Sequence, residues 1–160
     1  EDPNGGCVFW SAGAQPPELL MSGEVVMATG WNGRFFNAAV GEAAPIVQVW
    51  DGQGLDYEYF ALVKGGPNQE DAMKALAMMT STEMLAGSAK YIAYAPWRKS
   101  SIAVMQAGEP WYKDGKTNMV PHMPTAPANL KRYFLVDAEY WADNGTELGE
   151  KWEAMKASIK

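Results

Sequence analysis

The chain has 160 residues, of which 48% are hydrophobic and 20% charged, a balance typical of a soluble globular domain with a core. Its formal net charge of −6 argues against an affinity for nucleic acid or for anionic membranes, so we expect no nucleic-acid partner. Cys7 is the single cysteine, which excludes an intrachain disulfide and a metal site built on cysteines.

The first part of the chain alternates predicted helices and strands. Pro16 and Pro17 stand where the first turn of a helix tolerates proline, and Gly23 ends that helix. A second helix is predicted from Asn32 to about residue 40, closing at Gly41. Strands are predicted where β-branched and aromatic residues run between turn residues, at 24–29, 45–50 and 57–64.

The later part of the chain is mostly helical. Asn68 begins a predicted helix, and Thr80 with Glu83 fits a capping box for the next one, to about residue 92. Residues 113–127 predict a long irregular segment, and the last helix carries an apolar face of Leu148, Trp152, Met155 and Ile159. Together, the elements predict an α/β fold with a mostly parallel sheet.

Motifs for bond-breaking chemistry are missing from the sequence. No nucleophile elbow, P-loop or dinucleotide-binding glycine motif follows any predicted strand. His122 is the single histidine and has no cysteine or second histidine nearby, so we expect no metal site and no cofactor. A small α/β hydrolase or transferase stays open as an alternative, although Ser100 and Ser101 are poor candidates for its nucleophile.

Trp31 and Arg34 are the first candidates for ligand binding. They follow the predicted strand at 24–29, and open α/β sheets present ligands at the carboxyl ends of their strands. The Trp31 ring could stack on an alkyl chain or face an ammonium, and Arg34 offers a bidentate fork for a carboxylate. The alternative is that Trp31 packs in the core and Arg34 lies on the surface.

Asp56 and Glu58 are the second pair of candidates. If 57–64 is a strand, these two carboxylates share one face, while Tyr57 and Tyr59 point to the other. An acidic pair beside aromatic residues suits an amine, whereas the alternative is a solvated acidic turn.

Several short motifs occur in an order that resembles a known family. The chain is similar to the bacterial ABC-transporter solute-binding proteins of the spermidine/putrescine type in five motifs: Gly23-Glu24-Val25-Val26-Met27, Trp31-Asn32-Gly33, Val49-Trp50-Asp51, Phe60-Ala61-Leu62-Val63 and Tyr94-Ala95-Pro96. The resemblance implies a periplasmic-binding-protein-like (type II) fold of two α/β lobes, of which the chain would hold the C-terminal half. It implies a solute receptor without enzymatic activity that delivers its ligand to a membrane permease.

The same resemblance implies an organisation of the chain. Residues 1–56 would belong to the second lobe, 57–104 to the hinge strand and the first lobe, and 105–160 to the second lobe again. The protein would be periplasmic, and the start of the chain without methionine would be a mature or cut end. We expect the chain to pair with a missing N-terminal half or with a second copy of itself.

The family's site residues carry over by position. Trp31 would line the cleft, Asp56 or Glu58 would hold an ammonium, and Tyr94 and Asp137 would complete the site. Arg34 departs from the polyamine pattern, because an arginine in the cleft would repel a dication. The resemblance with this departure implies an ω-amino acid such as 4-aminobutyrate ahead of putrescine or spermidine.

Overall fold

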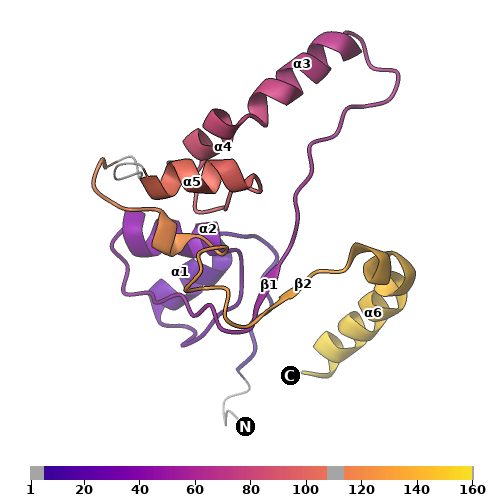
Figure 1. Cartoon of the computed structure of the whole chain (residues 1–160). Helices are drawn as coiled ribbons and strands as arrows, with labels where there is room; N and C mark the ends of the chain where they lie inside the picture. The colour runs from indigo at the N-terminus through magenta and orange to yellow at the C-terminus, as the bar shows by residue number, and fades with distance from the viewer. Residues whose placement is uncertain (1–5, 108–113, 160) are drawn as a thin grey trace. The chain divides into compact units, whose positions relative to one another are not determined.

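The computed structural model of the chain describes residues 6–107 and 114–159. Two structural units divide the chain, one made of residues 1–47 and 135–160 and the other of residues 48–134. We call them the first unit and the second unit and describe each by itself. The positions of the chain's parts relative to one another are not determined in Figure 1.

The first unit begins with helix α1, Gln15–Ser22. Pro16 and Pro17 occupy its first two positions and are buried, as the sequence predicts for prolines that cost no helical hydrogen bond there. Gly23 ends the helix at a φ of 74°, and its N–H bonds back to the carbonyls of Leu19 and Leu20. A positive φ of this kind favours glycine, so the predicted helix end is confirmed.

Helix α2, Asn32–Phe36, runs directly into the π-helical turn η1, Asn37–Gly41. The predicted helix from Asn32 to Gly41 is therefore confirmed, with a wider last turn. Its buried residues include Phe35, Phe36 and Ala38, and α1 packs against α2.

Helix α6, Ala138–Ser158, completes the first unit and confirms the predicted C-terminal helix. Leu148 and Met155 on its predicted apolar face are half-buried. Trp152 on the same face remains 50% exposed, and the Phe9 ring meets it edge-on with centroids 5.4 Å apart. The contact joins the start of the described chain to its last helix.

The second unit contains a two-stranded sheet of β1, Gln53–Leu55, and β2, Tyr133–Leu135, with β2 crossing the unit boundary at Leu135 (Figure 1). The Phe134 ring lies against Gly54, where an added Cβ would come within 2.7 Å of Cζ of that ring. Only glycine fits beneath the ring without a shift. The predicted strands at 45–50 and 57–64 leave this place out, so the position of β1 differs from expectation.

Among its described residues, the second unit contains the α-helices α3, Gln69–Met79; α4, Thr82–Ser88; and α5, Lys99–Ala107. The start of α3 agrees with the prediction, whereas α4 is capped one residue later than predicted and ends at Ser88, before the predicted end near residue 92. Ser81, not Thr80, accepts the bond from the Met84 N–H, and the Thr80 hydroxyl donates to the Leu76 carbonyl instead. The sequence analysis did not predict α5.

Helices α4 and α5 lie side by side (Figure 1). The fully buried Ser101 hydroxyl donates to the Thr82 carbonyl at 2.9 Å, which ties α5 to the start of α4. Leu85 and Met105 are buried in the same unit. The described part of the irregular segment at 113–127 contains one short 3₁₀ helix, η2, Val120–His122, and otherwise agrees with the prediction.

The predicted strands at 24–29, 45–50 and 57–64 are wrong for the described structure, and so is the mostly parallel sheet. These segments carry no regular secondary structure, and Val26, Val47 and Val63 are more than 80% exposed. A strand requires a neighbour that takes up its backbone N–H and C=O groups. Within the described residues, β1 and β2 alone supply such a ladder.

Candidate functional site

Trp31 lies at the start of α2, where its backbone is fixed from both sides. Its carbonyl accepts hydrogen bonds from the N–H groups of Arg34 at 3.0 Å and Phe35 at 3.5 Å. The preceding Gly30 passes close to buried side chains, since a Cβ there would lie 3.2 Å from both Phe35 and Pro16. The local sequence therefore holds the Trp31 backbone against the core of the first unit.

The Trp31 side chain is partly exposed to solvent. Its relative exposure is 55%, so Trp31 is not a core residue of the described structure, whereas Arg34 lies on the surface as the same alternative expects. The Trp10 ring meets it edge-to-face, with centroids 5.7 Å apart and planes at 78°. Gly13 lies beneath the same ring. The sequence analysis singled out neither partner, and Gly13 lies two residues before the start of α1.

Arg34 follows Trp31 by one helical turn and is exposed. Among the described residues, Arg34 takes part in no ion pair. An exposed guanidinium without an ion pair can bind a carboxylate, and a partly exposed indole can stack on an alkyl chain.

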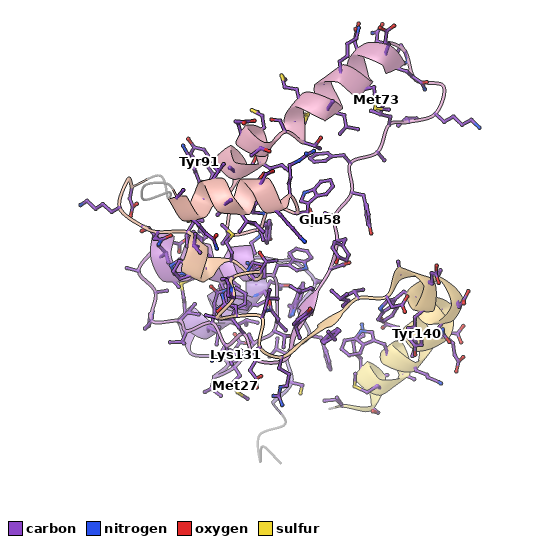
Figure 2. The ribbon with its side chains drawn as sticks, viewed as in Figure 1. Met27, Glu58, Met73, Tyr91, Lys131 and Tyr140 are labelled. Carbon is purple, nitrogen blue, oxygen red and sulfur yellow. The ribbon has the colours of Figure 1, made fainter. Side chains whose placement is uncertain are left out.

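Asp56 and Glu58 follow β1 and are exposed, and Figure 2 labels Glu58 on the long segment between β1 and α3. Asp56 Oδ1 accepts a hydrogen bond from the N–H of Tyr57 at 2.8 Å. Neither carboxylate forms an ion pair within the described part of the chain. Their predicted common face depended on a strand that is not formed here, so it has no support from the local backbone.

One aromatic contact ties this segment to the rest of the second unit. The rings of Phe60 and Trp97 stack with centroids 6.2 Å apart and planes at 25°. Tyr94, the third predicted site residue of this unit, is half-buried and lies three positions before Trp97. The sequence analysis did not single out Trp97, whose signal was only its place just after the Tyr-Ala-Pro motif.

Asp137 has a structural role that the sequence analysis did not assign. It is the N-cap of α6, and its Oδ1 accepts hydrogen bonds from the N–H groups of Glu139 at 3.0 Å and Tyr140 at 3.1 Å. Trp31, Arg34 and Asp137 thus belong to the first unit and Asp56, Glu58 and Tyr94 to the second. The structure places Trp31 at the N-cap of α2 and Arg34 three residues later in the same helix.

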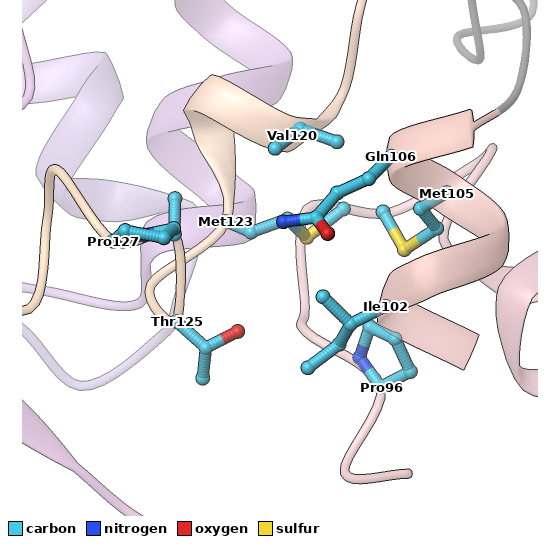
Figure 3. Close-up of a pocket in the computed structure, with 9 residues that line it drawn as sticks. Pro96, Ile102, Met105, Gln106, Val120, Met123, Thr125 and Pro127 are labelled. Atoms are coloured by element: carbon cyan, nitrogen blue, oxygen red, sulfur yellow. The ribbon is translucent and has the colours of Figure 1, made fainter. Parts of the chain in front are cut away.

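A small pocket in the second unit contains none of the predicted site residues (Figure 3). It lies between α5 and the segment around η2, and its empty space of about 260 Å³ includes open solvent. Its lining holds no charged group and is mostly apolar: Pro96, Ile102, Met105, Gln106, Val120, Met123, Thr125, Ala126 and Pro127. Such a lining offers no counter-charge to an ammonium or a carboxylate, so we do not assign a charged solute to it.

Among the described residues of the second unit, His122 and Asp114 have shifted pKa values. Partial burial lowers the pKa of His122 below its ordinary value of 6.5. Hydrogen bonds from the backbone of Thr117 and Lys116 lower the pKa of the exposed Asp114.

Within residues 6–107 and 114–159, no cluster of three or more His, Cys, Asp or Glu side chains is placed to hold a metal ion. No helix there is long and apolar enough to cross a bilayer.

Comparison with known proteins identifies the family. Residues 2–125 match the bacterial extracellular solute-binding protein family. The chain is 39% identical over 149 residues to a gamma-aminobutyric acid-binding protein of Pseudomonas aeruginosa, covering 93% of this chain and 39% of that protein.

A solved structure supports the same assignment. The fold is similar to that of an ABC transporter substrate-binding protein from Bradyrhizobium japonicum, with a TM-score of 0.70 and 26% identity. The alignment covers 92% of this chain and 43% of that one, so the chain spans about two fifths of either relative. The predicted fold class, part of a two-lobe α/β solute-binding architecture, is confirmed.

Solute-binding proteins of ABC transporters are transport components without enzymatic activity. The comparisons therefore support the expectation that the chain is not an enzyme, and they do not support the hydrolase or transferase alternative. The chain belongs to the bacterial extracellular solute-binding protein family.

Proposed function

We propose that the chain forms part of the ligand cleft of a periplasmic ABC-importer receptor for a small solute with an ammonium and a carboxylate group. An ω-amino acid such as 4-aminobutyrate fits this description, and the identity to a gamma-aminobutyric acid-binding protein supports it. The receptor would deliver its ligand to the membrane permease.

The observation that carries the proposal is the pair of Trp31 and Arg34. The guanidinium is exposed and has no ion-pair partner among the described residues, and the exposed indole stands one turn away. A carboxylate on Arg34 would leave the ligand's methylene chain against the Trp31 ring. A simple diamine would gain nothing from Arg34 and would be repelled by it.

Asp56 and Glu58 would bind the ammonium end. Both carboxylates are exposed and neither forms an ion pair within the described structure, so either can take a cation. We propose that these two acids and Tyr94 bind the ammonium end of the ligand. Closure of two lobes on the ligand would follow from better binding to the closed state.

The proposed organisation keeps the boundaries expected from the sequence. Residues 1–56 and 105–160 would form part of one lobe, and 57–104 would include the hinge and part of the other. The solute cleft of such a receptor needs both lobes. We therefore propose that the chain functions with the further segment that its relatives contain, or with a second copy that supplies equivalent strands.

The test is a binding titration on the chain joined to that further segment, with Arg34→Ala as the variant and Arg98→Ala as the control. Arg98 is also an exposed arginine without an ion pair in the described part of the chain. Loss of a charge-assisted hydrogen bond predicts about 10- to 100-fold weaker 4-aminobutyrate binding for Arg34→Ala only. Equal 4-aminobutyrate affinities of the parent and Arg34→Ala would contradict the proposal.

A polyamine receptor is the second candidate, favoured by the two unpaired carboxylates of Asp56 and Glu58. It predicts that putrescine or spermidine binds in the same titration while 4-aminobutyrate does not. It also predicts that Arg34→Ala leaves the diamine affinity unchanged or increases it, because removing a positive charge from the site cannot weaken the binding of a dication.

A further inference from the structure

We infer that Gly13 and Trp10 are positioning residues that fix the plane of the Trp31 indole. The inference concerns an arrangement within the first unit, and its consequence for ligand binding rests on the function proposed for Trp31. Neither residue belongs to the set predicted from the sequence.

Gly13 determines how closely the Trp31 ring can approach the turn before α1. A Cβ at this position would lie 2.3 Å from Cζ3 and 2.5 Å from Cε3 of the ring. Carbon atoms in contact normally stay about 3.5–4.0 Å apart. The indole is a rigid plane, so any side chain at position 13 must displace the whole ring or move the turn.

The turn that carries Gly13 is itself held in place. The side-chain oxygen of Gln15 accepts hydrogen bonds from the N–H groups of Ser11 at 2.7 Å and Ala12 at 2.9 Å. The N–H of Gln15 bonds to the Ala12 carbonyl at 3.0 Å, and the buried Pro16 follows in α1. An added side chain at Gly13 is therefore expected to move the ring rather than the backbone beneath it.

Trp10 supports the ring from a second direction. Its indole meets Trp31 at 78°, the edge-to-face arrangement that aromatic pairs prefer. Trp10 is half-buried, whereas Trp31 is 55% exposed. Gly13 and Trp10 thus contact Trp31 on the protein side and leave its remaining surface open to a ligand.

A fixed indole plane matters for the proposed ligand. Stacking of a methylene chain and attraction of an ammonium both depend on where the ring face points. A ring that is held before the ligand arrives also loses less side-chain freedom on binding. We therefore assign to Gly13 and Trp10 the preorganisation of the aromatic wall, while Trp31 itself makes the contact.

The experiment compares Gly13→Ala with Gly149→Ala. Gly149 lies in α6 of the same unit, and a Cβ there meets no atom within 4 Å. The first readout is near-ultraviolet circular dichroism of the 160-residue chain, which reports fixed indole environments without any ligand. We expect Gly13→Ala and Trp10→Leu to reduce the signal that Trp31→Ala also removes, and Gly149→Ala to leave it unchanged.

The second readout is 4-aminobutyrate affinity in the chain joined to its further segment. Gly13→Ala should weaken binding about 3- to 10-fold in the parent and have no further effect in the Trp31→Ala background. An additive loss in that background, or a Gly13→Ala dichroism spectrum identical to the parent's, would overturn the inference. If Gly13→Ala does not fold, Trp10→Leu decides by the same two criteria.

Failure of the proposed function has a different signature. If Trp31→Ala binds 4-aminobutyrate as tightly as the parent, Trp31 is not a ligand wall. The dichroism of Gly13→Ala still supports or overturns the positioning of the ring in that case.

Discussion

Arg132 donates hydrogen bonds from Nε and Nη2 to the two carboxylate oxygens of Asp51, with the Nε bond at 2.8 Å. The pair joins the residues just before β2 and β1, which are 81 positions apart in the sequence. Beside it in the chain, Gln53 Nε2 donates to the carbonyls of Pro124 and Asn129 at 3.0 and 2.8 Å. Near its two ends, the second unit is thus held by an exposed ion pair and by partly buried hydrogen bonds from the side-chain amide of Gln53.

We expect the side-chain hydrogen bonds of Asn129, whose carbonyl accepts from Gln53, to contribute more stability than the ion pair between Arg132 and Asp51. Asn129 is buried and its Nδ2 donates to the carbonyls of Pro121 and Met123, so Asn129→Ala leaves two acceptors without their donor. The expected loss is about 1–3 kcal/mol of unfolding free energy in urea. Arg132→Ala should cost less than about 1 kcal/mol, because solvent screens an exposed pair.

Asn118→Ala is the matched control for Asn129→Ala. Asn118 is exposed and its side chain accepts one local bond, from the Val120 N–H at 3.0 Å. We expect its loss of stability to be clearly smaller than that of Asn129→Ala. A larger loss for Arg132→Ala than for Asn129→Ala would show that the ion pair dominates.

Asp137 allows a cap to be separated from a ligand contact. Asp137→Ala removes the acceptor for the Glu139 and Tyr140 N–H groups and should cost about 0.5–2 kcal/mol, with loss of helical circular dichroism. Asp137→Ser keeps a capping oxygen and should stay near the parent in stability. If Asp137 also contacts the ligand, the serine variant will bind 4-aminobutyrate more weakly despite its normal stability.

Asp56 and Glu58 are expected to differ in their importance for the ammonium. Asp56 already accepts a bond from Tyr57, whereas no hydrogen bond or ion pair of the Glu58 side chain occurs in the described structure. Glu58→Gln should therefore weaken 4-aminobutyrate binding more than Asp56→Asn does in the titration of the joined chain. The reverse order would place the ammonium on Asp56, and unchanged binding in both variants would remove the acidic pair from the site.

The sequence predicted those elements whose signals are local. Proline at the start of α1, Gly23 at its end and the apolar spacing of α6 each act within a few residues, and the helices lie where these signals place them. The start of α5 at Lys99 carries no comparable cap signal in the preceding residues. Without such a signal, the sequence analysis assigned no element to residues 99–107.

The strands and the site depend on contacts that the sequence does not display. Residues 57–63 have strand-like composition, yet a strand exists only where a partner binds its backbone, and none does so in the described structure. Trp31 and Arg34 were predicted from a local motif. The approach of Gly13 to the Trp31 ring joins positions 18 residues apart, and no spacing rule reveals it.

His122 gives the second unit a pH dependence that the structure fixes in sign. Its folded pKa lies below 6.5, because partial burial disfavours the imidazolium, so the unfolded chain binds the proton more readily. The resulting stability is fully present above pH 6.5 and is lost as the pH falls through that value toward the folded pKa. When the pH is lowered from about 7.5 to about 5.5, the free energy of unfolding in urea should decrease less for His122→Gln than for the parent.

Asp114→Asn is the control for this pH series. The pKa of Asp114 is lowered from 3.8 by the bonds it accepts from Thr117 and Lys116, so this carboxylate stays ionised throughout the range. Its contribution is present above pH 3.8 and disappears only as the pH falls through its lower folded value. Between about pH 5.5 and about pH 7.5, the unfolding free energy of Asp114→Asn should thus change with pH as steeply as that of the parent. If His122→Gln keeps the same slope too, burial of His122 is not what makes the second unit sensitive to acid.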